Sequence, residues 1–124
     1  MYLHALATAV PSQRFTQPEC WEIAQRSGVL ARLSRRSRLL LHGILRGDHG
    51  IATRHFAMPD LDRVFERTAD ELNTAFRAEA PRLAGHALLA ALDESKTKPA
   101  QLDALLICTC TGYLCPGLTS YVAE

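Results

Sequence analysis

Residues 102–117 read Leu-Asp-Ala-Leu-Leu-Ile-Cys-Thr-Cys-Thr-Gly-Tyr-Leu-Cys-Pro-Gly, and this stretch decides the predicted fold. From Leu102 to Cys110 it is nearly all apolar, which is typical of a β-strand that helices cover on both faces. The preceding segment, 83–92, carries leucines and alanines at helical spacing behind Pro81, so we expect a helix that begins at this proline. A helix that leads into a buried strand indicates a mixed α/β layered fold.

Further elements are predicted on the amino-terminal side of this stretch. Leu3–Val10 has the alternation of a short strand, and Thr16 followed by Glu19 is typical of the start of a helix that ends near Gly28. A second helical stretch with an excess of arginine is expected over 29–45. We expect an extended piece over 51–56 and a charged helix over 60–79.

The last residues, 118–124, have the pattern of the first turns of a helix, with Thr119 or Ser120 able to cap it. No helix stop signal follows, so we expect the chain to be a truncated piece of a longer protein.

The composition is that of an ordinary globular protein. The 124 residues are 48% hydrophobic and 22% charged, with a formal net charge of +1, which favours one domain at most and gives no reason to expect a nucleic-acid partner. No apolar run is long enough to span a membrane, and the first residues lack the pattern of a secretory signal. We therefore expect a cytoplasmic protein.

Four cysteines are present, and three of them lie close together in the sequence. Cys108, Cys110 and Cys115 lack the paired spacing and the second ligand pair of a structural zinc site, and the five histidines are scattered. We expect no metal, and we expect the cysteines of the apolar stretch to be buried free thiols.

Two segments carry a resemblance to a known family. Gly-Ile-Ala-Thr-Arg-His-Phe at 50–56 resembles the short "GI-x-x-R-(H/Y)" piece of many initiating ketosynthases of the thiolase superfamily. The helix from Ala80, the apolar stretch and Cys-Thr-Cys-Thr-Gly-Tyr-Leu-Cys-Pro-Gly at 108–117 are similar to the chalcone/stilbene synthases, the type III polyketide synthases. The Pro-Gly ending separates those enzymes from the fatty-acid initiating ketosynthases.

The resemblance implies a fold and an activity. Residues 1–124 would be the amino-terminal portion of the chalcone/stilbene synthase amino-terminal domain, the first and incomplete part of a thiolase-like αβαβα layered fold. The parent enzyme would be a homodimeric acyltransferase that condenses an acyl-CoA starter with malonyl-CoA by decarboxylative Claisen chemistry to a pyrone, resorcinol or chalcone-like polyketide. Coenzyme A thioesters are substrates in this chemistry, and no cofactor is implied.

The same resemblance indicates which site residues to expect. The catalytic cysteine, histidine and asparagine of the family would lie beyond the end of this chain, so the chain alone is expected to be inactive. Cys110 and Thr111 match positions beside the acyl cavity, and Cys115 matches the position that reaches across the dimer interface into the partner's cavity. Arg46 and Arg38 are candidates for gripping the phosphates of coenzyme A, although a solvated helix face explains the arginines equally well.

Other interpretations remain open. Arg54 and His55 favour a structural pair over a catalytic one. The arginines do not fall on the positions where the family has basic residues, so a carrier protein remains an alternative to coenzyme A as the donor of the acyl group. The parent could instead be a β-ketoacyl carrier-protein synthase III of fatty-acid synthesis, or this chain could be a non-catalytic fragment or a dimerisation partner.

Overall fold

The computed structural model describes residues 2–58 and 60–124, which form two compact units. We call Pro11–Thr68 the sheet unit, because it holds the β-strands. We call Met1–Val10 together with Ala69–Glu124 the long-helix unit, because its main element is one long helix.

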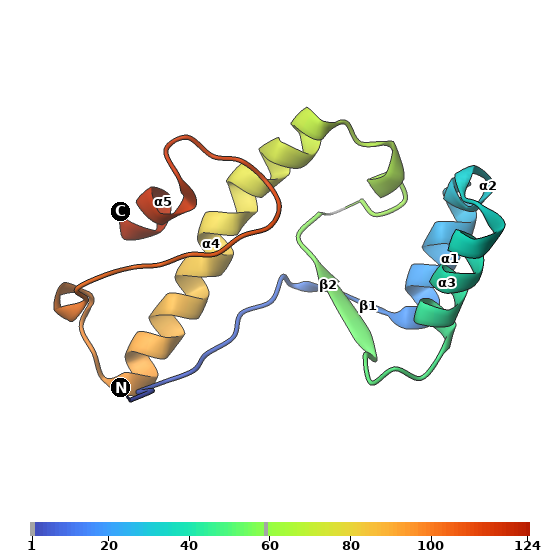
Figure 1. Cartoon of the computed structure of the whole chain (residues 1–124). Helices are drawn as coiled ribbons and strands as arrows, with labels where there is room; N and C mark the ends of the chain where they lie inside the picture. The colour runs from blue at the N-terminus through green and yellow to red at the C-terminus, as the bar shows by residue number, and fades with distance from the viewer. Residues whose placement is uncertain (1, 59) are drawn as a thin grey trace. The chain divides into compact units, whose positions relative to one another are not determined.

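The sheet unit combines a small antiparallel sheet with three helices (Figure 1). Strand β1 (Gln13–Thr16) pairs with β2 (Thr53–Phe56), so that Gln13 lies opposite Phe56 and Thr16 opposite Thr53. The segment between the strands forms α1 (Gln17–Arg26), α2 (Val29–Arg32) and α3 (Arg35–Arg46), and a short 3-10 helix η1 (Val64–Glu66) follows β2. The extended piece predicted over 51–56 is confirmed for its last four residues.

Helix α1 begins at the residue that the sequence predicted. Thr16 is the N-cap, and its hydroxyl accepts a hydrogen bond from the Glu19 N–H while the Glu19 carboxylate accepts one from the Thr16 N–H. This reciprocal capping box satisfies two N–H groups that the helix itself leaves unpaired. After Arg26 the chain turns through Gly28, whose φ of +69° is a left-handed conformation that glycine adopts without a steric penalty.

The helical stretch predicted over 29–45 is interrupted in the structure. The first piece ends at Arg32 with Leu33 as its C-cap, and Ser34 then caps α3 by accepting a hydrogen bond from the Ser37 N–H at 3.1 Å. Helix α3 packs against α1, where Ile23, Ala24 and Leu45 are buried. At the same contact the rings of Trp21 and His42 meet edge to face with their centroids 5.0 Å apart, which leaves Trp21 half-buried in the core.

The long-helix unit is built on α4 (Ala69–Ser95), which is followed by a 3-10 helix η2 (Pro99–Gln101) and by α5 (Leu118–Ala123). Helix α5 packs against α4. The chain between η2 and α5 has neither helix nor strand (Figure 1). Leu92 and Leu114 are the buried apolar side chains of this unit.

The predicted strands at Leu3–Val10 and Leu102–Cys110 are wrong. No strand is assigned in either segment, and Leu106 in the second is 89% exposed. A strand of this apolar kind is held by ladder hydrogen bonds and by helices on both faces. The described residues of the long-helix unit offer it no partner strand. Cys108 and Cys110 of this stretch are therefore exposed, where buried thiols were predicted, and Cys115 is exposed as well.

Two predicted helix starts and one predicted cap are also wrong. The helix expected over 60–79 begins at Ala69, and Pro81 lies inside α4 where a new helix was expected to open. An internal proline costs a helix about 3 kcal/mol, and here alanine, leucine, glutamate and arginine on both sides favour the helix and offset that cost. The N-cap of α5 is Gly117, and neither Thr119 nor Ser120 caps it.

The described residues are thus a mixture of helices and one small sheet, which agrees with the predicted α/β class. Layering of the thiolase kind stays a prediction. No helix in the described part of the chain is both long enough and apolar enough to span a membrane.

Candidate functional site

Residues 108–117, which we call the motif segment, are fixed to the amino-terminal half of α4. The Tyr113 N–H donates a hydrogen bond to the Asn73 Oδ1 at 2.9 Å. One residue earlier, the backbone at Gly112 lies directly against the ring of Phe76. Leu114, one residue later, is buried. Three successive residues of the motif segment are therefore held in place.

Gly112 is required by this arrangement. Its φ is +78°, and a Cβ atom added there would overlap the Phe76 ring. Only glycine combines a positive φ with the absence of a Cβ atom, so the backbone can approach the ring closely. The glycine of the motif therefore has a local structural reason in this chain.

The two ends of the motif segment have distinct local structures. The Thr109 hydroxyl donates to the Thr111 carbonyl oxygen at 2.8 Å and lies 3.4 Å from the Thr111 nitrogen. At the other end the Cys115–Pro116 peptide bond is cis, and Gly117 begins α5. The segment thus leads from an extended chain into a helix within ten residues.

The three residues predicted to contact substrate lie on this segment and are all exposed. Cys110 and Cys115 are free thiols, and Thr111 lies between them in the sequence, next to the glycine turn. Cys108 is exposed as well, which corrects its expected place in the core. The structure therefore leaves these side chains open to a ligand or to another protein surface.

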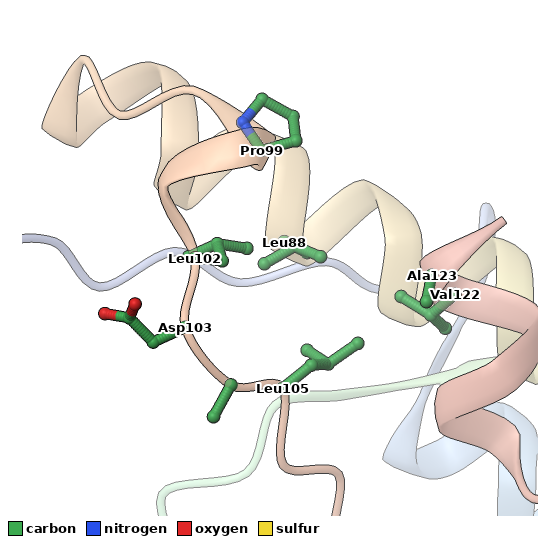
Figure 2. Close-up of a pocket in the computed structure, with 8 residues that line it drawn as sticks. Leu88, Pro99, Leu102, Asp103, Leu105, Val122 and Ala123 are labelled. Carbon is green, nitrogen blue, oxygen red and sulfur yellow. The ribbon is translucent and has the colours of Figure 1, made fainter.

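A groove of about 300 Å³ lies in the same unit, between α4, α5 and the chain after η2 (Figure 2). It was not predicted from the sequence, because it depends on how the apolar stretch returns along α4. Its lining is mostly apolar, and none of the predicted substrate residues contributes to it. The lining residues are Leu88, Pro99, Leu102, Asp103, Ala104, Leu105, Val122 and Ala123.

Arg38 and Arg46, the candidates for contact with coenzyme A, lie on α3 of the sheet unit. Both are exposed, and no ion pair is recorded for either among the described residues. Their guanidinium groups are therefore available to an anionic ligand. The structure places them on a different unit from Cys110, Thr111 and Cys115.

Arg54 and His55 have structural partners, as the sequence favoured. The Arg54 Nε donates to the Gln17 Oε1 at 2.9 Å, and the His55 Nδ1 lies 2.8 Å from the Pro11 carbonyl oxygen. Gln17 is only 6% exposed, and its amide nitrogen also donates to the Ile44 carbonyl oxygen at 3.3 Å. This buried glutamine joins β2, α1 and α3, and its role could not be predicted from the sequence beyond its place after the Thr16 cap.

Two titratable side chains at the start of α1, Glu19 and Cys20, have pKa values shifted from their ordinary ones. Hydrogen bonds from the Thr16 backbone and side chain lower the pKa of Glu19. Burial raises the pKa of the Cys20 thiol, which makes it a poor nucleophile.

Within residues 2–58 and 60–124, no group of three or more histidine, cysteine, aspartate or glutamate side chains is arranged to hold a metal ion.

Comparison with known proteins gives two relatives of the same kind. Over 116 residues, 94% of this chain, the sequence is 26% identical to 1,3,6,8-tetrahydroxynaphthalene synthase of Streptomyces coelicolor. Over 74 residues, 59% of the chain, it is 28% identical to 1,3,6,8-tetrahydroxynaphthalene synthase of Streptomyces griseus.

The alignments cover 30% and 20% of those two proteins, so the chain spans less than a third of the length of the curated relatives it matches. No protein-family profile matches the chain. Tetrahydroxynaphthalene synthase is a type III polyketide synthase. The predicted resemblance is therefore confirmed, and the chain is related to a part of the type III polyketide synthases.

Proposed function

We propose that this chain is the amino-terminal part of an acyltransferase that joins an acyl-CoA starter to malonyl-CoA by decarboxylative Claisen condensation and so makes a polyketide. The observation that carries the proposal is the match of 94% of the chain to a tetrahydroxynaphthalene synthase. The motif segment supports it, because its glycine and the following tyrosine are fixed to α4 by specific contacts. The amino-terminal placement and a thiolase-like layered fold are parts of the same proposal.

The chemistry would be divided between this chain and the rest of the enzyme. Acyl transfer needs a cysteine thiolate beside a base, and donors placed at the thioester oxygen where charge develops. We assign those groups to parts of the enzyme other than these 124 residues. Cys110, Thr111 and Cys115 would contact the growing acyl chain, with Cys115 reaching toward the second subunit of a homodimer.

The arginines of α3 would contribute to substrate binding. Arg38 and Arg46 are exposed and unpaired among the described residues, and guanidinium groups bind phosphate through paired, charge-assisted hydrogen bonds. In the proposed enzyme they would bind the phosphates of coenzyme A at the entrance to the active site.

The test uses the whole reading frame that contains these residues. The purified protein is incubated with malonyl-CoA and a panel of acyl-CoA starters, and carbon dioxide release and products are followed by mass spectrometry. We expect decarboxylation coupled to polyketide formation. Cys115→Trp should shift the products toward fewer extensions, because the larger side chain fills the acyl cavity. The control is Cys20→Ala, which lies in the sheet unit and far from Cys115 in the sequence, and it should leave the product pattern unchanged.

Two other results would replace this proposal. Activity only with acyl groups on a carrier protein, and a single condensation, would identify a β-ketoacyl carrier-protein synthase III. No turnover with either donor, combined with capture of a full-length synthase subunit, would identify a non-catalytic dimerisation partner.

A further inference from the structure

Helix α3 exposes a row of large apolar side chains that its packing against α1 does not use. Leu39, Leu40 and Ile44 are 66%, 59% and 47% exposed, and we call them the apolar strip. Leu45, by contrast, is buried in the core between α3 and α1. Successive residues of a helix are rotated by about 100°, so the three side chains of the strip are neighbours on the helix surface. Leu45 lies on a different side of α3. The strip therefore remains uncovered within the sheet unit.

Arginines border the apolar strip. Arg36 lies one turn before Leu40, while Arg35 and Arg46 share the helical row of Leu39. All three arginines are exposed, and among the described residues none has a recorded ion pair. The sequence has no aspartate or glutamate between Glu22 and Asp48, so no acidic side chain of this stretch neutralises them.

The excess of positive charge extends over the sheet unit. Residues 11–68 contain ten arginines and six acidic residues, a formal charge of +4, whereas the remainder of the chain has four basic and seven acidic residues, a formal charge of −3. The near-neutral total of +1 hides this asymmetry. A positive unit with uncovered leucines on a positive helix attracts a surface that is both anionic and able to take up apolar side chains.

We propose that α3 binds the surface of an anionic phospholipid membrane, lying in the plane of the interface with the apolar strip inserted among the acyl chains. Arg35 and Arg36 would then lie at the level of the lipid phosphates. A soluble polyanion such as coenzyme A would account for the arginines alone. It would not explain the three exposed aliphatic side chains beside the arginines, whereas an anionic lipid surface explains both features.

The experiment measures partition of the full chain into vesicles by sedimentation. One set of vesicles holds equal parts of phosphatidylcholine and phosphatidylglycerol, and the other holds phosphatidylcholine alone. We expect binding to the first set only, weakened by added salt because salt screens the attraction. Arg35→Gln/Arg36→Gln should lower the partition coefficient roughly 20- to 30-fold, since each arginine near an anionic surface contributes about 1 kcal/mol.

Two further variants separate charge from apolar insertion. Arg77→Gln/Arg82→Gln makes the same change of net charge on exposed positions of α4, and it should bind the mixed vesicles as the unchanged protein does. Leu40→Ser keeps the charge and should still lose several-fold in binding. Circular dichroism and Trp21 fluorescence verify that each variant is folded.

Five results would overturn the proposal. Equal binding to both sets of vesicles, or none to either, would exclude an anionic membrane surface. An equal loss in the α4 variant would show that only net charge matters. Weaker coenzyme A binding by Arg35→Gln/Arg36→Gln, or weaker self-association by Leu40→Ser, each with vesicle binding unchanged, would assign α3 to coenzyme A or to a second copy of this chain.

Discussion

Gly112 is the residue at which the motif segment comes closest to α4. We predict that Gly112→Ala destabilises the long-helix unit by at least about 1–2 kcal/mol, because alanine is disfavoured at a φ of +78° and its Cβ atom would overlap Phe76. The measurement is the urea midpoint of the far-ultraviolet circular dichroism signal, which α4 contributes to strongly.

A second glycine provides the matched control. Gly85 lies inside α4, and a Cβ atom there would meet no atom within 4 Å, so Gly85→Ala should leave stability unchanged or raise it by about 0.5–1 kcal/mol. A Gly112→Ala protein as stable as the Gly85→Ala protein would contradict the close approach of the motif segment to Phe76.

At the residue scale, local patterns were predictable and long-range partners were not. Thr16 and Glu19 could be identified because a capping box depends on residues only three apart. Gln17 and Asn73 could not, because their partners lie 27 to 40 residues away in the sequence. The exposure of Cys110, Thr111 and Cys115 likewise depends on the path of the whole apolar stretch, so their contact with substrate stays a prediction.

At the scale of a single element, the capping box makes the stability of α1 depend on pH. Hydrogen bonds from Thr16 hold the pKa of Glu19 in the folded protein below its ordinary value. The stabilisation is thus fully present above the ordinary glutamate pKa and is lost as the pH falls through the lower, folded value. We predict that acidification through this window lowers the thermal midpoint reported by Trp21, and that the drop is smaller in Glu19→Gln.

The matched variant, Thr16→Ala, removes the other side chain of the capping box. It should lower the free energy of unfolding by about 1 kcal/mol at neutral pH, a typical value for loss of an N-cap side chain. Glu19→Gln should cost less at that pH, because glutamine can still accept a hydrogen bond from the Thr16 N–H. Equal pH dependence in the unchanged protein and in Glu19→Gln would show that other carboxylates dominate the acid response.

Helices were better predicted than strands at this scale, and the reason is physical. A helix satisfies its own backbone hydrogen bonds, so α1 and most of α3 and α4 follow from local patterns. The exceptions are the Ser34 break and the internal Pro81, where one residue competes with its neighbours. Residues 102–110 have the apolar pattern of a strand, but a strand needs a partner, and the described residues of the long-helix unit provide none.

The whole molecule is divided into two units, and each has its own small core. Ile23, Ala24, Leu45 and Leu61 are buried in the sheet unit, and Leu92 and Leu114 in the long-helix unit. Domains with few buried side chains have little free energy of unfolding. The composition alone indicated one domain at most, because totals over a chain do not show where the contacts are concentrated.

Trp21 is the sole tryptophan and lies in the sheet unit, so its fluorescence reports unfolding of that unit specifically. We predict that urea unfolds the chain with different midpoints for Trp21 fluorescence and for circular dichroism, since separate cores need not unfold together. Gly112→Ala should move the circular dichroism transition and leave the fluorescence midpoint in place. Thr16→Ala should lower the fluorescence midpoint. If either substitution moved both transitions equally, the two units would unfold as one cooperative structure, and the cost of each substitution would be shared across the molecule.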